Sequence, residues 1–407
     1  MFSDYVDIRR GAEIKTGLER IKACLNYLGN PQKKYKSVLI TGTNGKGSVT
    51  FYLSNLACKF TDYKIGRYIS PHLILWNERF VINEMPVDGQ FLEDFSYDTL
   101  KKIESFENQS NVKLTTFEVY TVIAFYLFAK EKVDIAFWEI GMGGRLDATN
   151  VVDSEEVLCS VITNVSMEHT DYLGDGIEQI AHEKAGIIKE NNHAVTGASG
   201  AALDVIRKEA KNLNVNLISP GFADDILYSE KNIKIALAAW EVISQKIKTR
   251  ESSDKKEFLK SLQFPGRFQL LKEHKILLDG AHNPAGAVEL RKMLDNYCTD
   301  KKIVYILGIL DKDFKGFINN LISKNSLVVC VEPKSKRATS KELLSDYLTE
   351  HDCKSFVCKD LKEAIDTARK FEHDLIVITG SLYLVGEALE LVTKWSQWLT
   401  CKSARFS

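Results

Sequence analysis

The sequence predicts an α/β protein, and three of its features support this class. Short apolar runs with the composition of strands alternate with helical patterns along most of the chain. The first clear strand runs straight into a glycine-rich turn that opens a helix. A chain of 407 residues is longer than a domain with a single hydrophobic core usually is, and the alternation starts again in the last third of the chain. We therefore expect two domains, each built on its own sheet.

In the first part of the chain, strands and helices follow one another in an order that is typical of a parallel sheet covered by helices. Helical patterns are expected at residues 13–28, 47–58 and 115–129, and strands at residues 38–41, 64–69, 133–140 and 157–164. The sequence therefore predicts a mostly parallel sheet in this part.

A charged stretch that is poor in aromatic residues, 245–261, separates this part from the rest of the chain. Such a composition is typical of a surface helix end or a hinge between domains. Beyond it, strands are expected at residues 276–278, 303–307, 327–331, 355–357 and 375–378, with helical patterns between them. We place the boundary near residue 265, which gives a first domain at 1–264 and a smaller, Rossmann-like α/β domain at 265–407.

The composition is that of an ordinary globular chain, with 44% hydrophobic and 27% charged residues. The 54 Lys and Arg residues are balanced by 55 Asp and Glu residues. The chain therefore has no overall positive field to attract nucleic acid or a membrane surface. The first ten residues lack the apolar core of a secretory signal, and the apolar run 119–129 is shorter than the roughly 20 residues of a membrane span. We expect a cytoplasmic protein whose eight cysteines, none in a C-x-x-C pair, are reduced.

The turn after the first strand has the residues of a phosphate-binding loop. Glycines let backbone N–H groups face an anion, the following helix offers its positive N-terminus, and Lys46 can neutralise phosphate oxygens. Only two residues separate Gly42 from Gly45, whereas the common P-loop has four before its Gly-Lys pair, and a tight connection is the alternative interpretation. We predict a P-loop-type ATP site made by Thr43, Asn44, Gly45, Lys46, Gly47 and Ser48.

Three polar residues follow the ends of predicted strands, where open α/β sheets bind their ligands. Ser70 and Glu139 end or follow two strands of the first domain, and His169 comes shortly after a third. A hydroxyl and a carboxylate beside phosphates suit Mg²⁺, which takes few protein ligands, although His is an unusual one. Ser70, Glu139 and His169 are therefore candidate Mg²⁺ ligands, and the alternative is that the serine caps a helix or turn and the histidine makes an ordinary hydrogen bond.

The segments around these residues closely resemble the folylpolyglutamate synthase and dihydrofolate synthase family of the Mur ligase superfamily. Matching motifs occur in the same order over nearly the whole chain, and together they are far more specific than any one alone. They are Gly42–Ser48, Ser70–Leu73, Asn77–Arg79, Glu139–Asn150, Glu168–Gly174, Glu183–Lys189, Phe264–Gln269, Asp279–Pro284 and Gly380–Gly386.

The resemblance implies an ATP-dependent ligase that joins the amine of L-glutamate to the carboxyl group of dihydropteroate, of a folate, or of both. In this reaction ATP phosphorylates the carboxylate to an acyl phosphate, the amine attacks it, and amide and inorganic phosphate result. Such chemistry needs a counter-charge for the moving phosphoryl group, a role for Lys46 and Mg²⁺. The family also leads us to expect a monomer with small-molecule substrates only.

The resemblance also implies the roles of further residues. Ser70 and Glu139 would hold one Mg²⁺ and His169 a second, and Lys184 would be a carbamylated lysine that helps to bind the second ion. Carbamylation requires a neutral amine, hence a pKa lowered by burial or by a metal. The neighbouring His182-Glu183 pair does not predict zinc, because no second His follows at the needed spacing.

The family's remaining contacts fall on both predicted domains. Asn232 and Arg267 would contact the nucleotide, Asp279 would bind the ribose or organise a closed cleft, and His282 would act beside it. Asn232 departs from the pattern, because the small residues usual after it are replaced by Ile-Lys-Ile. The expected contacts of the pteroate or folate substrate are Gly17, Leu18, Thr116, Phe117, Glu118, Leu146, Asp147 and Ala148.

Two other functions stay open at this point. Another Mur ligase, acting on cell-wall peptide precursors, would share the phosphate loop and the metal site. A nucleotide-dependent switch would bind ATP but release no phosphate in response to glutamate. The extra Gly47 and the Ser70-Pro71-His72 segment favour the folate enzymes.

Overall fold

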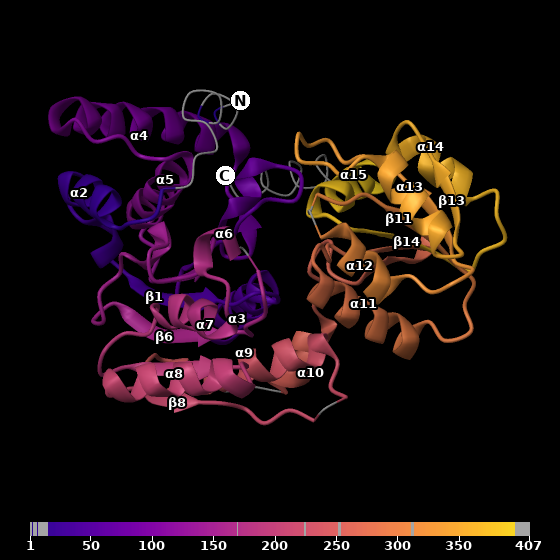
Figure 1. Cartoon of the computed structure of the whole chain (residues 1–407). Coiled ribbons are helices and arrows are strands. Elements are labelled where there is room, and N and C mark those ends of the chain that lie inside the picture. Colours follow the sequence, from indigo (N-terminus) through magenta and orange to yellow (C-terminus); the bar gives the residue numbers. More distant parts are fainter. Residues whose placement is uncertain are drawn as a thin grey trace. The chain divides into compact units, whose positions relative to one another are not determined.

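The computed structural model describes residues 15–168, 170–223, 225–250, 254–310 and 313–394, together with Phe2 and Val6. The chain forms two compact units (Figure 1). One contains the described part of residues 1–72 together with Trp76–Leu262, and the other contains Leu73–Leu75 and the described part of residues 263–399. In the described residues, no helix has the length and hydropathy of a membrane span.

The first unit is built on a mixed sheet in which the described strands have the order β4-β3-β2-β5-β1-β6-β7-β8. All neighbours from β2 to β8 pair in parallel, and β3 pairs antiparallel with both β2 and β4. The strands are β1 (Lys36–Thr41), β2 (Ile65–Tyr68), β3 (Phe80–Ile82), β4 (Met85–Pro86), β5 (Ile135–Glu139), β6 (Val157–Ile162), β7 (His193–Thr196) and β8 (Asn216–Ile218). This order places β1 between β5 and β6, so the residues that follow these three strands lie at one edge of the sheet.

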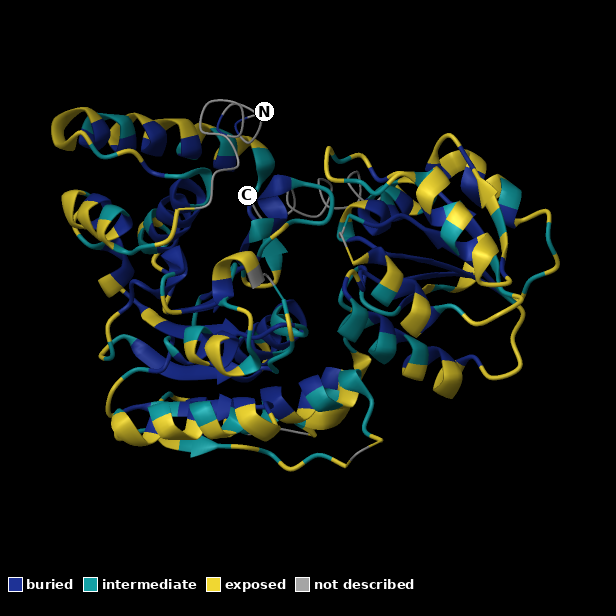
Figure 2. Cartoon of the chain, viewed as in Figure 1, coloured by how far each residue is buried: buried dark blue, intermediate teal, exposed yellow. Residues whose placement is uncertain are grey.

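Helices cover both faces of this sheet, because the central strands are apolar on both sides. In β1, Leu39 belongs to one hydrophobic cluster, whereas Val38 and Ile40 belong to the other. The first cluster includes α2 (Glu19–Tyr27), α4 (Gly89–Ser110), α5 (Thr116–Lys130), α7 (Ile177–Ala185) and α8 (Gly200–Asn212). The second includes α3 (Lys46–Phe60), α9 (Tyr228–Ser244) and α10 (Lys255–Ser261). Figure 2 shows the buried strands between helices whose outer faces are exposed.

The second unit has its own sheet, with the described strands in the order β13-β12-β11-β14-β10-β9. Only the pairing of β9 is antiparallel among these strands. Its elements are β9 (Gln269–Leu271), β10 (Ile276–Leu278), α11 (Pro284–Tyr297), β11 (Ile303–Leu307), α12 (Phe314–Leu321), β12 (Leu327–Cys330), α13 (Lys341–Glu350), β13 (Lys354–Val357), α14 (Leu361–Ala368), β14 (Leu375–Thr379) and α15 (Leu382–Thr393). Leu73 and Ile74, from the early part of the chain, pack against its core.

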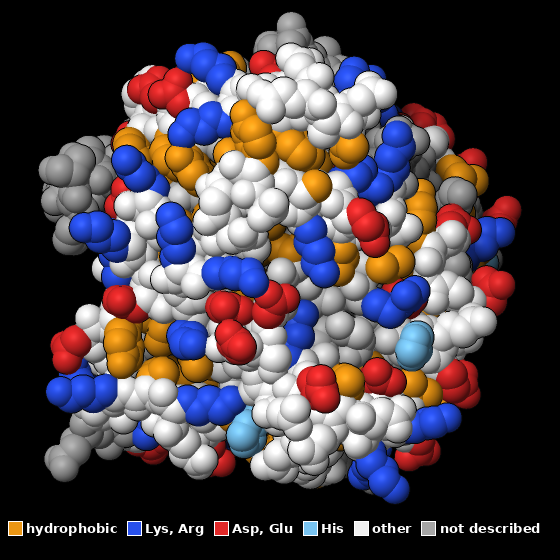
Figure 3. Space-filling view, turned by 90° about the vertical axis from the view of Figure 1, so that its left-hand side faces the viewer, with side chains coloured by type: hydrophobic (Ala, Val, Ile, Leu, Met, Phe, Trp, Pro, Cys, Tyr) orange, Lys and Arg blue, Asp and Glu red, His pale blue; other side chains and the backbone are white. Residues whose placement is uncertain are grey.

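The predicted α/β class is confirmed, with a mostly parallel sheet in each part of the chain. Sequence analysis missed the long helix α4, the antiparallel strands β3, β4 and β9, and the outer strands β7 and β8. On the face shown in Figure 3, acidic and basic side chains are interspersed, as the balanced charge of the chain suggests. The seven cysteines within the described residues are all free thiols.

Candidate functional site

The phosphate loop lies between the end of β1 and the first turn of α3. Gly42 and Gly45 have φ values of 147° and 84°, which disfavour any side chain, and Gly45 precedes the first helical residue, Lys46. No side chain of the described residues caps this helix. The first N–H groups of a helix have no acceptor within it, so those of α3 can bind an anion.

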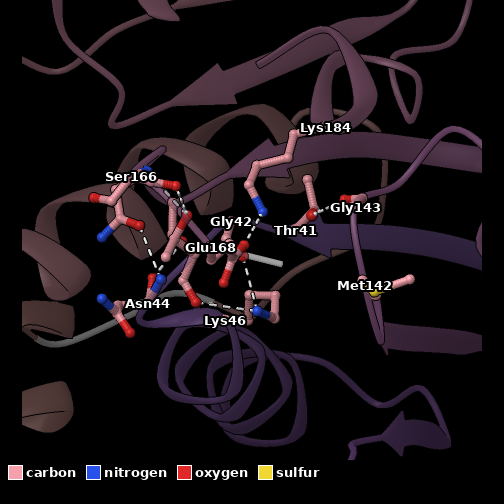
Figure 4. Close-up of polar contacts among 12 residues, drawn as sticks. Thr41, Gly42, Asn44, Lys46, Met142, Gly143, Ser166, Glu168 and Lys184 are labelled. Atoms are coloured by element: carbon pink, nitrogen blue, oxygen red, sulfur yellow. Dashed lines mark hydrogen bonds and ion pairs between the residues drawn. The ribbon is translucent and has the colours of Figure 1, made fainter. Parts of the chain in front are cut away.

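Lys46 folds back over this loop. Its Nζ donates hydrogen bonds to the carbonyl oxygens of Gly42, at 2.8 Å, and Thr43, at 3.1 Å (Figure 4). A charged phosphate oxygen accepts a stronger hydrogen bond from an ammonium than a neutral carbonyl oxygen does. A triphosphate at the loop would therefore be a better partner for Lys46 than these two carbonyl groups.

Lys184 is fully buried, and its Nζ lies 2.5 Å from Oε1 of Glu168 (Figure 4). It comes from α7, while Glu168 follows β6. Burial lowers the pKa of Lys184 to about 8, against the opposing effect of the Glu168 carboxylate, and the charge of Lys46 lowers it further. Sequence analysis did not single out Glu168 as the partner, and His169 lies outside the described residues.

Glu139 and Ser70 meet at the carboxyl ends of the adjacent strands β5 and β2. The Glu139 side chain is buried and its Oε2 accepts a hydrogen bond from the Ser70 N–H at 3.2 Å. The structure therefore brings together two of the three predicted metal ligands. No group of three His, Cys, Asp or Glu side chains suited to a metal is found within the described ranges, which exclude His169.

The predicted substrate residues Asp147 and Phe117 both lie beside Gly141, in the loop after β5. Asp147 Oδ2 accepts from the Met142 N–H at 3.0 Å, and its Oδ1 accepts from the N–H and hydroxyl of Thr149 at 2.9 and 2.5 Å. Burial raises the pKa of Asp147, although these hydrogen bonds oppose the shift. The Phe117 ring lies against Gly141, where a Cβ would come within 2.6 Å of its Cζ.

The other predicted substrate residues lie at the starts of α2 and α5. Gly17 and Leu18 precede α2, and Thr116 is the first residue of α5. Glu118 is buried and already engaged, since it caps α5 together with Thr115 and pairs with Arg20 at 3.0 Å. Leu146 and the buried Ala148 flank Asp147 in the chain.

Asn232 lies against the phosphate loop despite its atypical neighbours. It is buried in α9, and its Oδ1 is 2.5 Å from the position that a Cβ on Gly45 would take. Any side chain at position 45 would therefore collide with this amide. The structure brings this predicted nucleotide residue to the loop.

In the second unit, the predicted residues gather in two turns at the end of β10. The buried Asp279 accepts hydrogen bonds from the N–H groups of Phe268 and Ala281, both at 2.8 Å. Arg267 Nη1 donates to the Gly280 carbonyl at 3.4 Å, and His282 Nδ1 contacts the same oxygen at 3.0 Å. Asp279 Oδ2 thus holds the turn that carries Arg267, and Oδ1 holds the turn that carries His282.

Comparison with known proteins extends over nearly the whole chain. The Mur ligase middle domain family matches residues 40–271, and the family described as "Dihydrofolate synthetase, C-terminal domain" matches residues 267–391. A dihydrofolate synthase/folylpolyglutamate synthase of Bacillus subtilis is 30% identical over 435 residues, which cover 95% of this chain and 99% of the relative.

Solved structures agree with these matches. A folylpolyglutamate synthase from Thermotoga maritima has a TM-score of 0.80 and 32% identity, and the match covers 97% of each chain. The Mycobacterium tuberculosis folylpolyglutamate synthase, solved in complexes with ADP and AMPPCP, has a TM-score of 0.82 and 28% identity, covering 96% of this chain and 97% of its own.

Proposed function

Because the chain belongs to the dihydrofolate synthase/folylpolyglutamate synthase family of Mur ligases, we propose that it joins L-glutamate to dihydropteroate, to a folate, or to both. The predicted family and the class of ATP-dependent acid–amino-acid ligase are confirmed. The choice between the two acceptors, the Mg²⁺ ions and the roles of single residues belong to the proposal.

The observation that carries the proposal is the uncapped N-terminus of α3 with Lys46 beside it. The N–H groups at a helix start and a nearby ammonium together suit the charge of a triphosphate. On binding, Lys46 would exchange the carbonyl oxygens of Gly42 and Thr43 for phosphate oxygens.

The chemistry follows from the poor reactivity of a carboxylate toward amines. The substrate carboxylate attacks the γ-phosphorus of ATP, the bond to the bridging oxygen breaks, and ADP leaves an acyl phosphate behind. The neutral amine of glutamate then attacks the acyl carbon, a proton is lost from nitrogen, and inorganic phosphate leaves as the amide forms. Lys46 offsets the charge that develops on the transferred group.

The residues at the ends of β2 and β5 suit Mg²⁺. A buried carboxylate, Glu139, and the hydroxyl of Ser70 are hard oxygen ligands beside a phosphate loop, and Mg²⁺ takes few protein ligands when phosphates supply others. Ser70 and Glu139 would hold one ion, and His169 would hold a second. When bound, such ions neutralise phosphate charge.

We also propose that Lys184 is carbamylated. Only the neutral amine adds CO₂, and a pKa lowered to about 8 by burial supports a substantial neutral fraction. In the described arrangement Lys184 donates a hydrogen bond to Glu168, with Nζ and Oε1 2.5 Å apart, and this contact favours the charged amine over the neutral one.

One assay separates the candidate functions. Glutamate-dependent ADP formation should be measured with dihydropteroate and with a tetrahydrofolate, side by side. Turnover with either acceptor that requires glutamate supports the proposal, and the pattern of the two shows whether the enzyme is bifunctional. ATP binding without glutamate-dependent turnover of either acceptor would refute the proposal and leave the two alternatives, a switch or a Mur ligase with another substrate. A monomer in the cytoplasm, without nucleic-acid or membrane partners, remains our expectation.

A further inference from the structure

The turn after β6 holds the backbone of the phosphate loop through two side chains. Thr163 Oγ1 donates to the Asn44 carbonyl at 2.6 Å, and Asn164 Oδ1 accepts from the Asn44 N–H at 2.9 Å. Two backbone hydrogen bonds flank them, from Thr163 N to Thr41 O at 2.8 Å and from Thr43 N to Asn164 O at 3.0 Å. Both polar groups of the Asn44 backbone are therefore fixed by two residues of the turn after β6.

This arrangement sets the direction of the next N–H group. The peptide bond between Asn44 and Gly45 is trans, so its carbonyl and its N–H point in opposite directions. Since Thr163 holds the Asn44 carbonyl, the Gly45 N–H must point away from Thr163. Gly45 is the residue that precedes α3, so this N–H joins those that the helix start offers to an anion.

Thr163 is itself tightly held. Its side chain is 1% exposed, and a β-branched side chain has few rotamers to choose from. A Cβ on Gly42 would lie only 1.9 Å from Thr163 Oγ1, so the hydroxyl occupies space that glycine leaves open. The contact between the Thr163 hydroxyl and the loop thus requires both Thr163 and a glycine at position 42.

We propose that Thr163 is a positioning residue for ATP. Its hydroxyl orients the Asn44–Gly45 peptide so that the Gly45 N–H faces the triphosphate, while the Asn164 side chain holds the preceding Thr43–Asn44 peptide. The inference rests on the proposed function, because it requires ATP to bind at this loop.

The test compares two substitutions at the same position. Thr163→Val keeps the shape but loses the hydroxyl, and Thr163→Ser keeps the hydroxyl. We expect Thr163→Val to raise the Kd for ADP and the KM for ATP about tenfold, equivalent to about 1.4 kcal/mol, with the KM for glutamate unchanged. Thr163→Ser should stay within about twofold of the wild-type chain. Calorimetric titration with ADP and steady-state kinetics measure these quantities.

Ser160→Ala is the matched control. Ser160 lies on β6, the strand that precedes Thr163, is 1% exposed, and donates to the Ile187 carbonyl at 2.7 Å rather than to the phosphate loop. Both Ser160→Ala and Thr163→Val remove one buried hydroxyl hydrogen bond, so both should lower the melting temperature, but only Thr163→Val should weaken ADP binding. Wild-type ADP affinity in folded Thr163→Val would overturn the proposal.

If Thr163→Val does not fold, Asn164→Ala tests the hold of the same turn on the neighbouring Thr43–Asn44 peptide, at a half-buried position. We expect weaker ADP binding in this variant as well, and wild-type affinity would overturn the proposal. The wild-type chain is titrated in parallel, because failure of the wild type to bind ADP would refute the proposed function itself. If the wild type binds ADP and the variants bind it equally well, the role of Thr163 is refuted and the proposed function is not.

Discussion

Lys184 Nζ and Glu168 Oε1 form a short ion pair, 2.5 Å long, between the end of α7 and the turn after β6. The lysine is fully buried, and the glutamate side chain is 10% exposed. Burial of an ammonium is costly unless it is paired, so this contact stabilises the charged form of Lys184 against desolvation. Addition of CO₂ removes that charge and replaces it with a carboxylate, so modification must rearrange this pair.

Carbamylation of Lys184 should increase with pH at a constant partial pressure of CO₂. With a pKa of about 8, the neutral fraction is about one tenth at pH 7 and about nine tenths at pH 9. The ¹³C NMR signal of a carbamate, after equilibration with ¹³CO₂, measures the adduct. Lys189, whose pKa burial also lowers to about 8, is the matched comparison. The signal should vanish in Lys184→Arg and persist in Lys189→Arg, and the reverse pattern would refute the assignment.

Lys46→Ala should lower kcat by at least about a hundredfold, because the transferred phosphoryl group loses its fixed counter-charge. Lys59→Ala is the control, since Lys59 is an exposed lysine in the last turn of the same helix. Steady-state ADP formation with saturating glutamate measures both variants. Equal activity in the two variants would show that Lys46 does not act on the phosphates.

Glu139→Gln should raise the Mg²⁺ concentration for half-maximal activity about tenfold or more, because a neutral amide is a weaker ligand than a carboxylate. Glu107→Gln is a suitable control. Glu107 is also buried and accepts a backbone N–H, from Leu114 at 2.8 Å, but it lies in α4. An identical Mg²⁺ dependence in both variants would argue against Glu139 as a ligand, and chelation of Mg²⁺ should abolish activity in the wild type.

Phe117→Ala should raise the KM for the pteroate or folate acceptor and leave the Kd for ADP unchanged. The ring lies beside Gly141, and loss of an aromatic contact with a ligand costs roughly 1 kcal/mol, about a fivefold change in KM. Tyr126→Ala removes a half-buried aromatic ring from the same helix and should leave this KM unchanged. A rise in the Kd for ADP in Phe117→Ala would point to a general disturbance of the site instead.

Sequence reasoning succeeded where neighbouring residues determine the structure. The apolar run around Leu39 predicts a buried strand, and the glycines around Lys46 predict the loop, because both signals are local. The hairpin of β3 and β4 was missed because its strands are very short and its turn uses Asn83 and Glu84 rather than Asn-Gly.

The site residues that sequence analysis did not predict are recognisable only from their tertiary contacts. Thr163 and Asn164 contact Asn44 across more than a hundred positions, and nothing in their own segment indicates it. Glu168 was only part of a motif until the fold placed it beside Lys184. Burial, which lowers the pKa of Lys184, is likewise a property of the packed chain and not of the residue type.

The segment Leu73–Leu75 has a practical consequence for gene fragments and chimaeras. This segment belongs to the second unit, and Leu73 and Ile74 pack on the core of that unit. The Leu73 carbonyl oxygen lies only 2.1 Å from the position that a Cβ on Gly386 would take. A polypeptide that starts at Gln263 would lack this apolar cover and would be prone to aggregate. Exchange of the second unit between relatives should therefore include these three early residues together with the C-terminal part of the chain.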